Sequence, residues 1–162
     1  MIACQIKEIK SFMNILLATE TFDKFLFEEG TVTTFMTTSY DGTYQKDYFD
    51  TNEEQNIPFI QYQLIRPILF DHIKGKKTPL SFQFTLHASP TYAMKLITQN
   101  DLNIDPALVR ALLFHVRFEH GTLRLITGTS FATFVMDKSL EQAWDQAFLK
   151  SLDVMHISYE LL

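Results

Sequence analysis

The run Lys-Gly-Lys-Lys-Thr-Pro at residues 74–79 is the segment of this sequence best suited to binding an anion. It stands where a helical pattern ends and a strand pattern begins, so we expect its side chains and backbone to be exposed. Lysine ammonium groups there can contact phosphates, with a contribution from two further bases. The predicted phosphate or nucleic-acid contacts are Lys46, Arg66, Lys74, Lys76 and Lys77. A structural interpretation stays open, because lysines at a helix C-terminus also interact favourably with the helix dipole. Each such lysine stabilises the helix by about 0.3–1 kcal/mol.

Two histidines, His87 and His115, fall on the polar faces of two predicted strands and would be neighbours if those strands pair. With Arg117 they are candidates to converge in a cleft between the two halves of the chain. This is our alternative hypothesis, a small-ligand-binding protein or a small hydrolase. A metal site would need a third ligand, which the sequence does not identify, so we predict no metal and no cofactor.

The sequence contains no P-loop, no dinucleotide-binding glycine pattern, no GxSxG and no HExxH. Ser130 follows Gly128, but without the strand–turn–helix context of a nucleophile, so we interpret it as a turn residue. The single cysteine, Cys4, falls on the apolar register of a strand, which predicts a buried and unreactive thiol. We therefore assign no catalytic residue and favour a non-enzymatic binding or scaffold domain whose partner is a protein or a nucleic acid.

Charge is distributed unevenly along the 162 residues, whose formal net charge is −5. Residues 41–56 carry five acidic side chains against one lysine, whereas residues 57–100 carry five basic side chains against one aspartate. The stretch from residue 137 onward is acidic again. Such asymmetry produces local potentials that the net charge hides, although a solvated loop beside a basic turn would show the same pattern.

No apolar run approaches the roughly 18 residues that a membrane-spanning helix needs. The first ten residues also lack the pattern of a signal peptide. We therefore expect a cytoplasmic protein that makes no membrane contact, and a homo-oligomer is an open possibility.

Hydrophobic periodicity in the first half predicts a strand at 2–6 and a helix at 9–17. The Phe- and Thr-rich stretch 22–38 is typical of a strand, bent or bulged near Gly30. Asp41-Gly42 predicts a hairpin turn with a returning strand at 44–49, followed by a polar loop at 50–56. Pro67 favours the first position of a short helix over 67–74, with Gly75 as its left-handed stop.

In the second half, strict alternation predicts strands at 80–88 and 112–118, with a helix from Ser89-Pro90 through residue 98 between them. A turn at 119–122 leads into a long strand over 123–136, interrupted near Gly128. Ser139 and Gln142 predict a capping box for a helix in which Trp144 anchors the core. A final alternating strand covers 154–161.

Read as elements, the order β-α-β-β-α occurs over residues 2–74 and again over 80–152. Each half would have one apolar sheet face, which is too small to stand alone. We therefore predict a single α+β domain of residues 1–162. Its largely antiparallel sheet would carry the helices on one side.

This element order resembles one domain of the sliding clamps that hold polymerases on DNA. In that family the helices face the nucleic acid and expose basic residues, which implies such a role here for Lys7, Lys10 and Lys95. The last predicted helix departs from the pattern because it exposes Glu141 and Asp145, which would repel phosphate.

Four local strings also resemble an uncharacterised bacterial family known only as a domain of unknown function. They are IKSFMN near the start, RP at 66–67, KGKKTPLSF at 74–82, and TGTS with DKSLEQAWD within 127–145. This resemblance spans the chain and implies no activity.

Overall fold

The computed structural model describes residues 1–49 and 57–162, so the predicted loop at 50–56 lies outside the described residues. Helices and strands follow the predicted alternation. In chain order they are β1 (Ala3–Ile6), α1 (Ile9–Ala18), β2 (Leu26–Thr33), β3 (Thr37–Asp41), the short 3₁₀ helix η1 (Lys46–Tyr48), β4 (Ile60–Gln61), α2 (Tyr62–Ile73), β5 (Ser81–His87), α3 (Pro90–Gln99), the 3₁₀ helix η2 (Pro106–Leu108), β6 (Val109–Glu119), β7 (Thr122–Phe131), α4 (Ser139–Val154) and β8 (Tyr159–Leu161).

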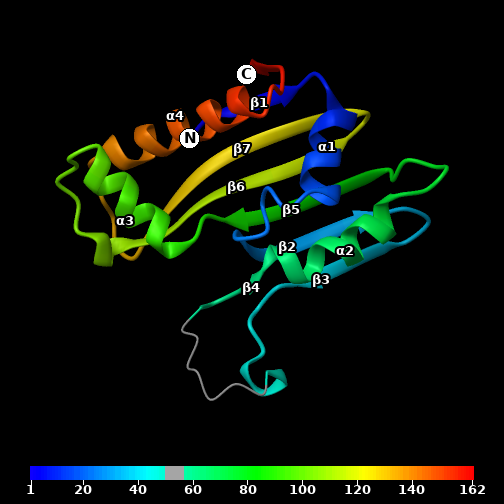
Figure 1. Cartoon of the computed structure of the whole chain (residues 1–162), viewed down its shortest axis with the longest axis horizontal. Helices are drawn as coiled ribbons and strands as arrows, with labels where there is room; N and C mark the ends of the chain where they lie inside the picture. Colours follow the sequence, from blue (N-terminus) through cyan, green and yellow to red (C-terminus); the bar gives the residue numbers. More distant parts are fainter. Residues whose placement is uncertain (50–56) are drawn as a thin grey trace.

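The strands form one antiparallel sheet in the order β3-β2-β5-β6-β7-β1-β8, with β4 beside β2. Figure 1 shows α1, α2, α3 and α4 on the same side of this sheet. The predicted α+β class with an antiparallel sheet and one-sided helices is confirmed. Strand neighbours differ between the halves, because β5 pairs directly with β6 whereas β1 pairs with β7 and β8. The division into half-units therefore stays a prediction.

The helix-covered side of the sheet carries the core. Val32, Phe82, Phe118 and Leu123 lie opposite one another across β2, β5, β6 and β7, and all four are buried. The rings of Phe82 and Phe118 stack with their centroids 5.0 Å apart. Residues of all four helices pack on these strands in one continuous cluster, so a single core serves the described chain.

The other side of the sheet is polar and open. Thr31, Gln83, Arg117 and Arg124 follow one another across the same four strands, and all are exposed. The alternation of each strand thus separates an apolar, covered face from a hydrated one.

The first hairpin differs from the prediction. Its turn lies at residues 34–36, and residues 44–49 hold η1 instead of a returning strand. Gly42 is needed for a different reason: its N–H donates to the carbonyl of Glu28 at 2.8 Å, and a Cβ there would lie 1.9 Å from the carbonyl oxygen of Phe27. The predicted bulge falls between Phe27 and Glu29, slightly before Gly30.

Helix α2 begins five residues before Pro67, so the prediction that this proline starts the helix is wrong. Contacts from other parts of the chain hold its first turn. The N–H of Tyr62 donates to the carbonyl of Phe25 at 2.7 Å, and the Tyr62 hydroxyl donates to the carbonyl of Leu16 at 2.9 Å. These contacts offset the roughly 3 kcal/mol that an interior proline costs. Gly75 has a φ of 159°, far from the left-handed helical value predicted for it.

The second half follows the prediction more closely, with corrections at element ends. The turn between β6 and β7 contains His120 and Gly121, both at positive φ (51° and 72°), as a two-residue hairpin requires. Strand β7 continues through Gly128 and ends at Phe131, and β8 has only three residues.

The predicted capping box of α4 is wrong. The Ser139 hydroxyl has no hydrogen-bond partner in the described part of the chain. The side chain of Asp137 instead accepts the Ser139 N–H at 2.8 Å.

Gly42→Ala tests the close approach of the chain to β2. We expect this substitution to lower the free energy of unfolding by about 2–3 kcal/mol, because backbone atoms must move to admit a Cβ. Gly128→Ala is the matched control, since its Cβ would meet only the flexible end of Leu113, at 3.1 Å. Urea denaturation followed by circular dichroism measures both. Equal stabilities of the two variants would contradict the interpretation.

Candidate functional site

One end of the sheet carries a groove with a cavity volume of about 1020 Å³. It is bounded by α1, the end of α2, the turn at 74–80 that leads into β5, and the turn between β6 and β7. We call this cavity the basic groove. Its lining residues are Ile9, Lys10, Met13, Thr33, Ile73, Lys74, Gly75, Thr78, Pro79, Leu80, Ser81, Phe82, Phe118, Glu119, His120 and Gly121.

The floor of the basic groove is mainly aliphatic. Leu80 is 70% exposed, although the alternating pattern predicted its side chain on the apolar face of β5. Its N–H donates to the carbonyl of Thr33 at 2.9 Å, which fixes the backbone just before the strand. Phe82 and Phe118 are buried, whereas Leu80 is exposed and Ile9, Met13 and Ile73 are partly exposed.

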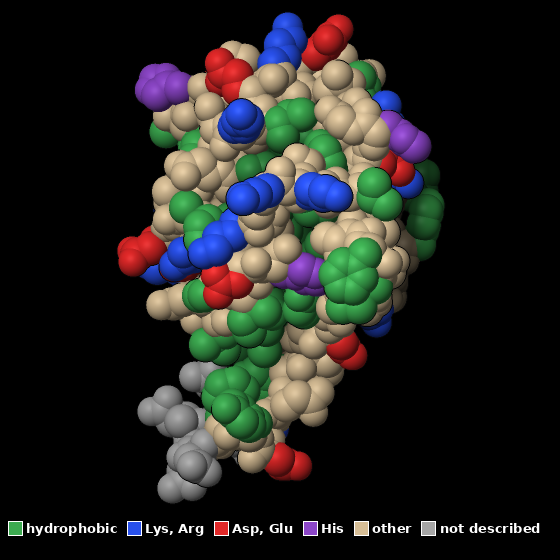
Figure 2. Space-filling view, turned by 90° about the vertical axis from the view of Figure 1, so that its right-hand side faces the viewer, with side chains coloured by type: hydrophobic (Ala, Val, Ile, Leu, Met, Phe, Trp, Pro, Cys, Tyr) green, Lys and Arg blue, Asp and Glu red, His purple; other side chains and the backbone are tan. Residues whose placement is uncertain are grey.

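Lysines form the rim of the basic groove. Lys10 and Lys74 line it, and Lys76 and Lys77 lie exposed in the same turn as Lys74. Figure 2 views this end of the molecule and shows basic side chains gathered across it, with hydrophobic side chains beside them.

The positive charge of this rim is only partly compensated. Lys74 Nζ lies 3.3 Å from Asp71 Oδ1 and 5.0 Å from the ring centroid of Phe70. Within the described ranges, Lys76 and Lys77 form no ion pair. Such exposed charges raise the association rate of an anionic partner and are screened by salt.

Arg66 lies toward the opposite end of α2 and does not line the basic groove. Its guanidinium forms two hydrogen bonds with the carboxylate of Asp23, at 2.7 and 3.2 Å. Both side chains are largely buried, and hydrogen bonding to Asp23 raises the pKa of Arg66. This pair joins α2 to the loop after α1, which is a structural role.

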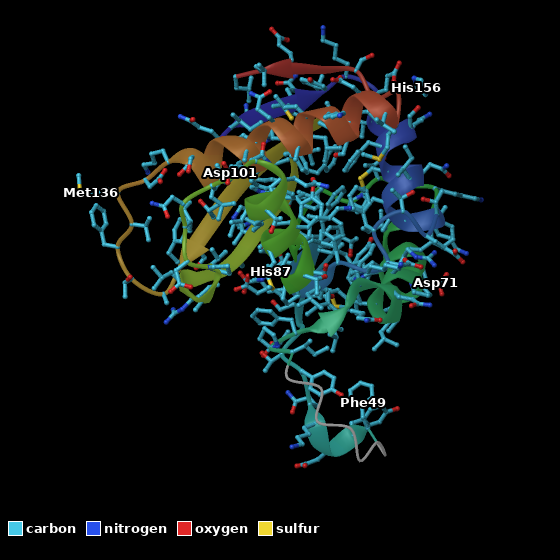
Figure 3. All side chains as sticks on the ribbon, turned by 60° about the vertical axis from the view of Figure 1, so that its left-hand side comes forward. Phe49, Asp71, His87, Asp101, Met136 and His156 are labelled. Atoms are coloured by element: carbon cyan, nitrogen blue, oxygen red, sulfur yellow. The ribbon has the colours of Figure 1, made fainter. Side chains whose placement is uncertain are left out.

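Lys46 lies in η1, on the excursion between β3 and β4. Figure 3 places the neighbouring Phe49 at the far tip of the molecule, away from Asp71 in α2. The structure therefore brings Lys74, Lys76 and Lys77 together and leaves Lys46 apart. Lys10 joins the group, and its signal in the sequence was its place on the polar side of the helix pattern at 9–17.

The two histidines of the alternative hypothesis lie together on the open side of the sheet. His87 is buried and donates from Nε2 to Glu28 Oε2 at 2.6 Å, because the bulge in β2 turns Glu28 toward it. His115 Nδ1 is hydrogen-bonded to Thr85 Oγ1 at 2.9 Å. Burial lowers the pKa of His115, although nearby carboxylates act in the opposite direction. Arg117 pairs with Glu119 at 3.4 Å.

A shallow cavity of about 420 Å³ lies on the same open side and is lined by Thr85, Glu28, Glu29 and Asp41, among others. Among the described residues, no group of three His, Cys, Asp or Glu side chains could hold a metal ion. Cys4 is fully buried as predicted, and burial raises the pKa of its thiol to about 11.

Comparison with known proteins identifies one family. A sequence model described as "Family of unknown function (DUF5721)" matches residues 15–160. Searches of curated proteins and of solved structures found no match to this chain. No helix in the described part of the chain is long and apolar enough to span a membrane.

Arg66→Gln tests the structural role of the ion pair. We expect it to lower the free energy of unfolding by about 2 kcal/mol or more, since Asp23 is then left largely buried without its partner. Lys76→Gln is the control and should change stability by less than about 0.5 kcal/mol, because Lys76 is exposed. Thermal and urea unfolding measure both. A neutral Arg66→Gln would contradict this assignment.

Acidification tests the burial of His115. The unfolded chain binds a proton at this residue near its ordinary pKa of about 6.5, whereas the folded protein does so only at lower pH. The stability that neutral His115 contributes is therefore present above about pH 6.5 and is lost as the pH falls below that value. His115→Gln should lose less stability than the parent protein between about pH 7 and pH 5. Parallel losses in the two proteins would refute the prediction.

Proposed function

This chain belongs to the family of unknown function DUF5721, and we propose that it is a non-enzymatic binding protein whose basic groove receives an acidic, leucine-rich segment of a partner protein. The predicted membership of an uncharacterised family is confirmed by the match over residues 15–160. One observation carries the proposal: exposed lysines stand at the rim of an apolar groove that contains an exposed leucine. The clamp-like fold, bacterial origin, cytoplasmic location and homo-oligomer stay predictions.

The floor of the groove favours a peptide over a nucleic acid. Proteins that hold single strands commonly stack bases on exposed aromatic rings. Here Phe82 and Phe118 are buried, and the accessible apolar side chains include Leu80 and Ile73. Aliphatic side chains of a peptide would be buried on such a floor, with a contribution of about 1.5–3 kcal/mol for a fully buried leucine.

The charges favour an acidic partner. Lys10 and Lys74 line the groove, Lys76 and Lys77 lie exposed in the same turn as Lys74, and the one lining acid, Glu119, is paired with Arg117. Carboxylates of a peptide would meet these lysines at the rim, where they set orientation and association rate. The net charge of −5 opposes non-specific attachment to DNA or RNA.

Fluorescence anisotropy with a labelled peptide of alternating Glu and Leu tests this function. The triple variant Lys74→Gln, Lys76→Gln, Lys77→Gln should bind the peptide at least about tenfold more weakly, because it removes the charges of the rim. For the parent protein, affinity should fall as salt rises from about 50 to about 200 mM, since exposed charges are screened.

A charge-matched variant is the control. The triple Lys46→Gln, Lys95→Gln, Lys150→Gln removes the same charge from exposed lysines that neither line the groove nor belong to the turn at 74–80, and it should change the affinity less than about twofold. Equal losses in the two triples, or no peptide binding at low salt, would refute the proposal.

A labelled single-stranded DNA of the same charge distinguishes the two classes of partner. Tighter binding of this DNA, dependent on the lysines at 74, 76 and 77, would favour a nucleic-acid interface and reject the peptide. Leu80→Gln separates the classes further. It should weaken peptide binding, because it removes apolar contact area, and leave the affinity for DNA unchanged.

A further inference from the structure

A second cavity, of about 630 Å³, lies on the helix-covered side of the sheet and shares no lining residue with the basic groove. Its walls come from residues 20–25, which connect α1 to β2, and from α3 and α4. These elements belong to the two predicted halves of the chain. The volume lies within the range of about 300–1,000 Å³ that is usual for small-molecule sites.

Five aromatic side chains line this cavity. Tyr92 and Trp144 meet edge to face, with ring centroids 5.9 Å apart, and Trp144 lies 5.7 Å from Phe148. Across the cavity, Phe22 and Phe25 form another edge-to-face pair at 5.3 Å. Phe22, Trp144 and Phe148 are almost fully buried, whereas Phe25 and Tyr92 are partly exposed and can contact an aromatic ligand. An edge-to-face contact of this kind adds about 0.5–1.5 kcal/mol beyond area burial.

Polar and charged side chains complete the walls, and they are Glu20, Thr21, Asp23, Lys24, Gln63, Ser89 and Ser151 beside the polar groups of Tyr92 and Trp144. Trp144 donates its indole N–H to the carbonyl of Leu113 at 3.0 Å, which fixes its ring and leaves no donor for a ligand. The Tyr92 hydroxyl forms no hydrogen bond with the described residues, so it can hydrogen-bond to a ligand. The hydroxyl is protonated at neutral pH, because the ordinary pKa of tyrosine is about 10 and burial raises that of Tyr92 further.

The charged groups of the cavity balance one another. Asp23 is neutralised by Arg66, and Glu20 and Lys24 carry opposite charges at the mouth. A charged ligand that enters this cavity would lose its hydration and find no unpaired opposite charge there. The free-energy cost of that desolvation would weaken its binding.

We propose that this cavity binds a neutral aromatic small molecule that carries one hydrogen-bonding group for the hydroxyl of Tyr92. This site is independent of the basic groove, so either proposal can fail without the other. Trp144 is 3% exposed, so it is a core residue as the sequence predicted, and it also lines this cavity.

Trp144 is the single tryptophan of the chain, so its emission reports on this cavity alone. The probe is N-phenyl-1-naphthylamine, a neutral aromatic amine with one N–H. We expect saturable quenching of Trp144 together with a rise in probe emission. Tyr92→Phe should weaken probe binding about three- to tenfold, the effect of losing one hydrogen bond.

Cavity-filling variants complete the test. Ala147→Leu with Ser151→Leu places two larger side chains in the cavity and should abolish the quenching. Gln146→Leu with Lys150→Leu adds apolar groups at exposed positions of the same helix and should leave binding unchanged. Circular dichroism confirms that each variant is folded. Non-saturable quenching, or equal binding by the filled variant and its control, would overturn the proposal.

Discussion

The pairing of β2 with β5 is the contact on which the rest of this structure depends. It joins strands of the first half to strands of the second in one sheet, so the apolar faces of both halves become a single surface. Such a surface must be covered, because exposed apolar area of this extent is unfavourable in water. Helices from both halves cover it from the same side, and the other side keeps its polar residues in water.

Both candidate sites arise from how four helices share that surface. At one end of the sheet, α1, the end of α2, the lysine-bearing turn and the turn between β6 and β7 together line the basic groove. Near the other ends of β2 and β5, the loop after α1 meets α3 and α4 and leaves the aromatic cavity.

On the open side of the sheet, an irregularity in one strand determines which polar side chains meet. One bulge in β2 turns Glu28 toward His87, and the chain lies so close to this bulge that only glycine fits at position 42. Phe59 then packs edge to face on His87, with ring centroids 5.0 Å apart. These contacts anchor the base of the excursion between β3 and β4. His87 is therefore held by Glu28 and Phe59, while the Glu28 side chain also lines the shallow cavity on this side of the sheet.

The hydrophobic periodicity of the sequence by itself predicted many of the helices and strands. The alternation of residues 80–88 and 112–118 and the helical spacing of 139–152 predicted real elements, because these patterns report which side of each element avoids water. The exposed lysine turn was also predictable, since it separates two such patterns. Three further points depend on tertiary structure alone. Pro67 lies inside a helix, Arg66 pairs with Asp23, and Lys10 lines the same groove as Lys74. Each of these depends on contacts between residues that are distant in the chain. Such contacts can outweigh the conformational preference of a single residue, and they do not appear as a periodic pattern in the sequence.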